Sequence, residues 1–155
     1  MRIRKATDAD TSSLTRLFLA LYRELEQYDP SGKVKKNPQK YAEDYVQKRM
    51  GDERSVFFVL DGGKDIIGYV LASIKKRKNI FVRKEYGYIY DLYVLPAYRG
   101  KMLAEKLIAA VEDFFNKKGI KEIELQVLCT NEPALRFYAK HGWGEHRKKL
   151  QKLLD

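Results

Sequence analysis

Apolar residues in the first half of the chain recur with two periods, one typical of helices and one typical of strands. Leu14, Leu17 and Leu21 lie three or four residues apart, and Asp10 precedes them as a helix cap. Shorter runs rich in Val, Ile and Phe, separated by the turn Asp61-Gly62-Gly63-Lys64, have the composition of paired strands. The pattern predicts strands over 3–6, 55–60 and 66–74, a helix over 11–27, and a helix opened by Asn37-Pro38.

The second half shows the alternation more sharply. An aromatic and β-branched run ends at Pro96, and a long stripe of apolar residues then continues to Gly119, a typical helix stop. The pattern predicts strands over 86–94, 123–128 and 145–150, and helices over 99–118 and 131–140. Strands that alternate with helices predict an α/β or α+β fold, in which helices cover a central sheet.

Composition limits the classes of function that remain. The chain has 155 residues, which predicts a single domain over 1–155, and its 31 Lys and Arg against 21 Asp and Glu give a net charge of +10. This excess favours anionic partners: nucleic acid, an acidic membrane or a phosphate-bearing cofactor. With one cysteine, Cys129, and two histidines, we expect no disulfide and no metal site. No apolar run reaches ~20 residues and no signal peptide is visible, so we expect a cytoplasmic protein without a membrane partner.

The joint between the strand ending at Val94 and the following helix carries the most chemistry. The first turn of a helix exposes backbone N–H groups and the positive end of the helix dipole. Gly100 permits close approach of a ligand, and Arg99 and Lys101 add positive charge. Such a turn can hold a pyrophosphate, although an ordinary helix start with surface cations has the same residues. No Walker A or Gly-x-Gly-x-x-Gly motif is present, so a nucleoside-triphosphate or Rossmann site has no support.

Two segments resemble motifs of the GCN5-related N-acetyltransferase (GNAT) family. Residues 90–101, Tyr-Asp-Leu-Tyr-Val-Leu-Pro-Ala-Tyr-Arg-Gly-Lys, resemble its main acetyl-CoA motif. Residues 131–143, from Asn131 through Phe137-Tyr138 to Gly142-Trp143, resemble the motif that follows. The resemblance extends to the first strand and so covers nearly the whole chain. It implies a mixed, mostly antiparallel central sheet, splayed in the middle between the strands ending at Val94 and Leu128, with helices on both faces.

The same resemblance implies a set of contacts to acetyl-CoA. The backbone of Leu92, Tyr93 and Val94 would bind the pantetheine arm, which Asn131 would also hold. Tyr138 would face the thioester sulfur, where its hydroxyl could donate a hydrogen bond to the developing thiolate. The pyrophosphate would lie on the helix start, at Arg99, Gly100, Lys101, Met102, Leu103 and Ala104.

Met102 departs from the family pattern, which has glycine at this position. A helical residue there needs no positive φ, and its N–H group is still available to a phosphate. We therefore expect cofactor binding to persist, with the methionine side chain crowding the phosphates unless it turns aside. A CoA-binding protein without turnover stays open as an alternative on this ground.

Asp91 is the candidate general base. Some relatives, resembling diamine acetyltransferases, have Glu-Asp where this chain has Tyr90-Asp91, so the aspartate matches and the tyrosine does not. Because adjacent strand residues point to opposite faces, Tyr90 and Asp91 are not expected to enter one cleft. A water relay is an alternative to direct proton transfer to Asp91.

The sequence therefore predicts an N-acetyltransferase that transfers the acetyl group of acetyl-CoA to a primary amine by direct attack in a ternary complex. The acceptor is a small-molecule amine or a peptide or protein amine. The net charge of +10 disfavours a polyamine, although Glu24, Glu26 and Asp29 lie in a segment that often borders the family's acceptor cleft. A basic nucleic-acid-binding module is a further alternative, without a recognition motif to support it. The resemblance also allows a homodimer.

Overall fold

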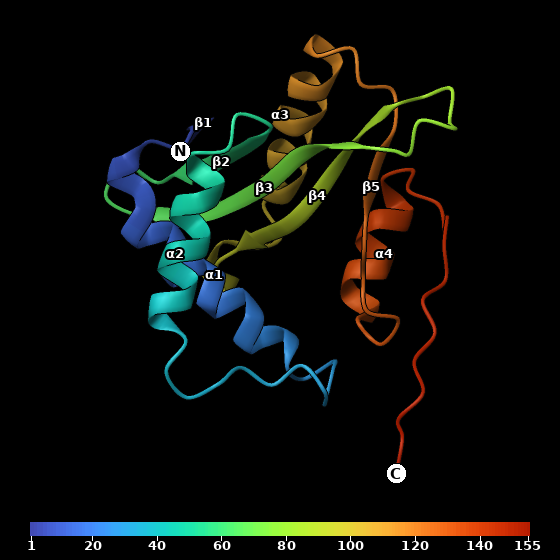
Figure 1. Cartoon of the computed structure of the whole chain (residues 1–155). Coiled ribbons are helices and arrows are strands. Elements are labelled where there is room, and N and C mark those ends of the chain that lie inside the picture. The colour runs from blue at the N-terminus through green and yellow to red at the C-terminus, as the bar shows by residue number, and fades with distance from the viewer.

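The computed structural model describes residues 1–155 and contains one five-stranded sheet (Figure 1). The strands keep their chain order across the sheet, and every neighbouring pair is antiparallel except the last, which is parallel. The strands are β1 (Arg2–Lys5), β2 (Ser55–Asp61), β3 (Ile66–Lys76), β4 (Glu85–Val94) and β5 (Ile123–Leu125). The helices are α1 (Thr11–Leu25), α2 (Gln39–Met50), α3 (Leu103–Lys117) and α4 (Glu132–Lys140), with 3₁₀ turns at Asp8–Asp10 and Pro96–Tyr98.

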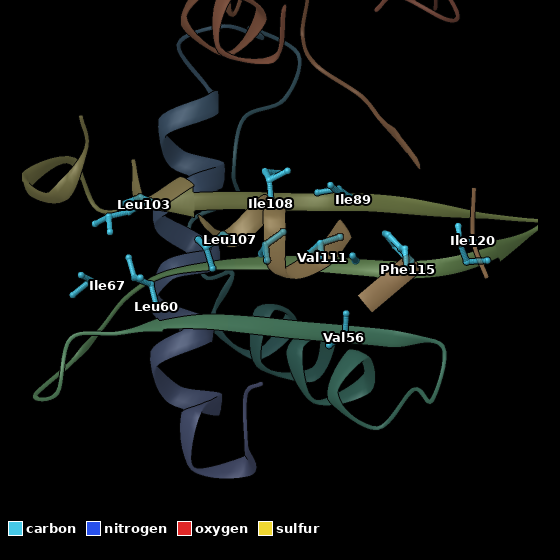
Figure 2. Packing of buried hydrophobic residues seen from close by; sticks show 13 residues of the cluster. Val56, Leu60, Ile67, Ile89, Leu103, Leu107, Ile108, Val111, Phe115 and Ile120 are labelled. Carbon is cyan, nitrogen blue, oxygen red and sulfur yellow. The ribbon is translucent and has the colours of Figure 1, made fainter. Parts of the chain in front are cut away.

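Alternation along the strands gives the sheet two apolar faces. On β2, Val56 and Leu60 face α3, whereas Phe57 and Val59 face α1 and α2. Figure 2 shows the α3-side cluster, which consists of Val56, Leu60, Ile67, Val70, Ala72, Ile89, Val94, Leu103, Leu107, Ile108, Val111, Phe115 and Ile120. The α1/α2-side cluster consists of Leu14, Leu17, Phe18, Leu19, Ala42, Val46, Phe57, Val59, Ile66, Tyr69, Leu71 and Tyr93. The predicted mixed sheet with helices on both faces is confirmed.

A β-bulge in β4 changes which side chains face each layer. Asp91 lies opposite Leu71 and Ile89 lies opposite Ala72, so Tyr90 is an extra residue in β4. Tyr90 packs against the α1/α2-side cluster, and Asp91 accepts hydrogen bonds from tyrosines on that same side. The expectation that Tyr90 and Asp91 face opposite sides is therefore wrong, because it holds only for a regular strand.

β4 has a partner on its β5 side over only part of its length. Residues 87–89 pair with 123–125, and residues 90–94 continue without a strand beside them on that edge. The strand predicted over 123–128 ends at Leu125 for the same reason, since its last three residues have no ladder to join. The sheet is thus splayed after Ile89, as predicted.

Two other predicted elements differ from the structure. No strand forms over 145–150, because residues 145–149 are Glu, His, Arg, Lys and Lys and offer no apolar face to bury. Helix α3 begins at Leu103 instead of Arg99, since Gly100 and Met102 both have a positive φ that an α-helix excludes. None of the helices combines the length and apolar composition needed to cross a bilayer.

Candidate active site

The chain between β4 and α3 presents a row of backbone N–H groups. Those of residues 100–105 donate to no protein acceptor, and the bond nearest the start of α3 runs from Lys106 N to Met102 O, at 3.4 Å. No side chain caps α3. Positive φ values of 75° at Gly100 and 56° at Met102 turn the segment tightly. Free donors at the positive end of a helix dipole suit an anion, at the position where the sequence predicts a pyrophosphate.

Met102 has a left-handed backbone, with φ 56° and ψ 29°, and lies before α3. The expectation of a helical residue that needs no positive φ is therefore wrong. Glycine adopts this conformation freely, whereas a residue with a Cβ atom does so at a cost of ~1–2 kcal/mol. The side chain of Met102 is 66% exposed, so it extends into solvent and fills no part of the core.

Arg99 is bound by the protein itself. Its Nε donates to Val94 O at 2.8 Å, and its two terminal nitrogens donate to Glu24 Oε1 and Oε2 at 2.8 and 2.9 Å. This fork joins the end of α1 to the loop before α3. Arg99 therefore fixes the shape of the loop. Lys101, whose Nζ lies 5.6 Å from the ring of Tyr98, has no carboxylate partner and is the freer cation of the motif.

The acids of residues 24–29 bind within the chain. Glu24 holds Arg99, and Glu26 and Asp29 each accept a backbone N–H group from the loop after α1, at 2.8 and 2.9 Å. These charges are already engaged, so the segment gives little support to an acidic acceptor cleft.

Asp91 is buried at the bulge of β4, with 3% of its surface exposed. Tyr22 of α1 donates to its Oδ1 at 3.1 Å, and Tyr69 of β3 donates to its Oδ2 at 3.3 Å. Burial raises the pKa of the Asp91 carboxyl to about 6, against the lowering effect of the two hydroxyls and of the Arg49 cation. An acid that titrates near neutral pH is a candidate proton acceptor, and the less buried of its two tyrosine partners is Tyr22, a residue that is 37% exposed.

Three residues around Asp91 had no sequence signal that marked them: Tyr22, Tyr69 and Arg49. Arg49 of α2 lies 4.3 Å from the ring of Tyr90 and contributes positive charge near Asp91. In the sequence each of the three reads as part of a helix face or a strand. Only the packing of α1 and α2 on β3 and β4, together with the bulge, brings them to one place.

Tyr138 is a half-buried residue of α4 that packs against the α3-side cluster. The rings of Phe137 and Trp143 lie 5.2 and 5.6 Å from its own. Burial first, and the charge of Asp91 second, raise the pKa of the Tyr138 hydroxyl to about 12. The charge of one candidate catalytic residue, Asp91 of β4, thus acts on the hydroxyl of the other, Tyr138 of α4. The hydroxyl keeps its proton at neutral pH.

The remaining candidates lie on β4 and at the start of α4. Leu92 and Val94 face the α3 side and Tyr93 faces the other side, all in the part of β4 that has no β5 partner. Asn131 precedes α4, and its Oδ1 accepts the N–H of Ala134 at 3.2 Å. Asn131 thus caps the helix, and its amide N–H₂ group stays free to donate to a ligand. Leu103 is buried in the core and Ala104 is half-buried, so these two residues offer backbone N–H groups only.

Comparison with known proteins identifies the family of the chain and its fold. The model of the acetyltransferase (GNAT) family matches residues 18–143. An uncharacterized N-acetyltransferase of Archaeoglobus fulgidus is 30% identical over 139 residues, which cover 90% of each chain. The fold is similar to a tetramutant of the BH1408 protein from Bacillus halodurans, with a TM-score of 0.88, 23% identity, and coverage of 99% of this chain and 100% of that one. It is also similar to the aminoglycoside N-acetyltransferase AAC(6')-Iy in complex with CoA, with a TM-score of 0.78, 19% identity, and coverage of 99% and 93%.

The family match includes both motifs and most of the chain, and the sheet has the splay that the motifs imply. The chain therefore belongs to the acetyltransferase (GNAT) family, and it is an acetyl-CoA-dependent N-acetyltransferase.

Proposed function

We propose that the protein transfers the acetyl group of acetyl-CoA to a primary amine in a ternary complex, through the residues described above. One observation carries the assignment of the site: a row of free N–H groups at the start of α3 follows, after one 3₁₀ turn, on a stretch of β4 without a strand partner. Both features supply donors to a long, anionic ligand. The buried acid Asp91 lies in that same stretch of β4.

The free N–H groups of residues 100–105 would bind the pyrophosphate, with Lys101 adding a mobile positive charge. The unpaired backbone of residues 92–94 would bind the pantetheine amides as a neighbouring strand would. The amide of Asn131 would donate to the same arm. When bound, acetyl-CoA supplies an activated thioester carbonyl and a thiolate leaving group.

Asp91 would take the proton that the acceptor amine must lose. An alkyl amine has a pKa of about 10.4, so it is mostly protonated at pH 7 and needs a base or a desolvating site. Above pH 6 the carboxyl of Asp91 is mostly ionised, but it is too buried to meet the amine directly. Tyr22, partly exposed and bonded to Oδ1, would accept a proton from the amine while passing its own to Asp91.

Tyr138 would donate its hydroxyl proton in a hydrogen bond to the departing sulfur. Its pKa of about 12 keeps the proton in place at neutral pH. A Cys-like thiol has a pKa of about 8.5, so complete transfer from Tyr138 is uphill, and stabilisation by a hydrogen bond is the expected role.

The acceptor would be an amine with a single positive charge, on a small molecule or a peptide. Arg49 near Asp91, and the overall charge of +10, both oppose a polycation. We also propose a cytoplasmic location, where a chain with one unpaired cysteine stays reduced. A homodimer stays a prediction, which light scattering on the purified protein would test.

Release of free thiol from acetyl-CoA, followed over small amines, polyamines, amino acids and peptide N-termini, tests the proposal. Tyr138→Phe should lower kcat by about tenfold or more while the Kd for CoA changes little, because the hydroxyl acts late in the reaction. Tyr41→Phe, on an exposed tyrosine of α2, is the matched control. Unchanged kcat in Tyr138→Phe would remove the assigned role. Binding of CoA with no thiol release from any amine would favour the CoA-binding alternative.

A further inference from the structure

The turn between β3 and β4 exposes apolar side chains among cations. Residues 75–84, here called the β3–β4 tip, read Lys-Lys-Arg-Lys-Asn-Ile-Phe-Val-Arg-Lys and contain no acid. Ile80 is 82% exposed, Val82 is 99% exposed and Phe81 is 49% exposed. Figure 1 shows this hairpin end extending away from the helices. Consecutive exposed apolar residues of this size mark an interaction surface.

The base of the β3–β4 tip is braced by ion pairs. Arg77 bonds to Glu122 and Glu124 at 2.7 and 3.1 Å, and Arg83 bonds to Glu122. The N–H of Arg77 donates to the carbonyl of Lys84 at 2.7 Å, which closes the turn. The structure thus holds the apolar residues outward on a fixed support.

The cations that remain free surround the apolar residues. Lys76, Lys78 and Lys84 are exposed and have no carboxylate partner, because Glu122 and Glu124 are bound to the two arginines and Glu85, opposite Lys76, is bound to Arg54. A lysine stem can lie along an apolar surface while its ammonium group stays at a polar boundary. The tip therefore presents an apolar centre within a positive rim.

We propose that the β3–β4 tip is a docking surface for an anionic lipid bilayer. Ile80, Phe81 and Val82 would enter the boundary between headgroups and acyl chains, and the three lysines would bind lipid phosphates and carboxylates. The absence of a spanning helix and of a signal segment led the sequence to predict no membrane partner, but neither observation concerns surface docking. The exposure of residues 80–82 is visible only in the fold.

Two other occupants fit this surface less well. Nucleic acid would use the lysines and could stack a base on Phe81, but it would leave Ile80 and Val82, the two more exposed residues, without a partner. A second copy of the chain would bring two tips of like charge together, which electrostatic repulsion opposes. A lipid surface is the partner that uses both the apolar residues and the cations.

Docking at the tip would leave the candidate active site accessible. The tip precedes β4, whereas the free edge of residues 90–94 lies at the other end of that ten-residue strand. A strand of this length spans about 30 Å. The membrane contact and acetyl transfer would therefore proceed at separate places on the molecule.

Co-sedimentation of the full chain with sucrose-loaded vesicles tests the proposal, with phosphatidylcholine alone compared with phosphatidylcholine plus phosphatidylserine. The double variant Ile80→Ser, Val82→Ser removes the apolar centre, and the triple variant Lys76→Glu, Lys78→Glu, Lys84→Glu reverses the rim. The matched control Lys33→Glu, Lys35→Glu, Lys36→Glu makes the same change in net charge on another exposed loop. Acetyl transfer to a soluble amine checks that each variant is folded.

The expected result is binding to phosphatidylserine vesicles only, weakened at least about tenfold by either tip variant and by much less in the control. Equal loss in the tip and control charge variants would overturn the proposal, since binding would then follow net charge alone. Full binding by the Ile80→Ser, Val82→Ser variant, with competition by duplex DNA, would overturn it in favour of nucleic acid. Loss of binding only on changing the exposed Leu150, Leu153 and Leu154 to serine would place the contact elsewhere.

Discussion

The hydroxyl of Tyr22 donates to the Oδ1 atom of Asp91 at 3.1 Å, so a partly exposed residue of α1 is bonded directly to a buried acid of β4. The acid itself has almost no contact with solvent. Any proton that enters or leaves Asp91 through Tyr22 therefore passes where α1 packs on the sheet. This gives the packing of α1 on β4 a chemical consequence as well as a structural one.

Tyr22→Phe should shift the pH profile of the reaction. The hydroxyl lowers the pKa of Asp91, so its loss should raise that pKa above about 6 and move the acidic limb of kcat/KM to higher pH. Removal of the proton path should also lower kcat about tenfold or more. The pH–rate profile measures both effects. Tyr41→Phe is the control, and an acidic limb that stays in place in Tyr22→Phe would show that Asp91 is not the titrating group.

Asp91→Asn should make the stability of the protein less dependent on pH, and it should also abolish most of the activity. The pKa of Asp91 is about 6 when folded, against 3.8 for an unperturbed carboxyl. Below pH 3.8 the acid is protonated in both states; between 3.8 and 6 the unfolded state loses its proton first, so stability falls as pH rises. The full penalty, about 2–3 kcal/mol, is present above pH 6.

Urea unfolding at pH 4 and at pH 8 measures this penalty. The difference in free energy of unfolding, Asp91→Asn minus the original protein, should be about 2–3 kcal/mol larger at pH 8 than at pH 4. This change does not depend on how stable the variant is at pH 4. An identical pH dependence in both proteins would show that Asp91 is not destabilised by burial.

Met102→Gly should stabilise the protein slightly and preserve cofactor binding. Relief of the left-handed backbone is worth ~1–2 kcal/mol, and the greater freedom of glycine in the unfolded chain offsets about 0.4–1 kcal/mol of that. Thermal unfolding and calorimetric titration with acetyl-CoA measure the two quantities. Lys101→Gly, at a position without positive φ, should instead destabilise the protein. A large loss of acetyl-CoA affinity in Met102→Gly would reveal a direct role for the methionine side chain.

Glu24→Gln should weaken acetyl-CoA binding without a comparable loss of kcat. The carboxylate accepts hydrogen bonds from both terminal nitrogens of Arg99. The glutamine amide has one oxygen, so it can accept a hydrogen bond with good geometry from only one of them. The loop before α3 then loses part of its fixed shape, so KM for acetyl-CoA should rise about threefold to tenfold. Steady-state kinetics measure this, with Glu53→Gln as a control on an exposed residue without an ion pair. A tighter complex in Glu24→Gln would mean that Glu24 withholds Arg99 from the cofactor.

Most of the fold could be predicted from the local spacing of apolar residues, because the helices and strands that this spacing indicates are kept in the packed structure. Leu107 and Val111 have the helical spacing that places them against the sheet, and the aromatic run ending at Val94 forms β4. The turn at Gly100 marks the start of α3 to within a few residues. These features depend on periods of two and three to four residues, which one sequence displays directly.

The parts that could not be predicted depend on contacts between distant segments. Tyr69 and Tyr22 reach Asp91 over 22 and 69 residues of sequence, and nothing local indicates either contact. The strand predicted over 145–150 does not form, because this segment has no apolar face that could pack on the sheet. The positive φ of Met102 lies at a position where sequence favours a helix, because the tight turn at this joint overrides the local preference.

The bulge in β4 also determines how this strand can change in evolution. Without Tyr90, Ile89 would be followed directly by Asp91. The residues from Gly87 to Val94 would then alternate regularly between the two faces of the sheet, and all the remaining side chains would keep the face that they have now. Deletion of this one residue would therefore remove the ring beside Arg49 while leaving the acid facing α1. Homologous strands that differ in length by one residue here could share the same acid yet offer an acceptor two quite different surfaces.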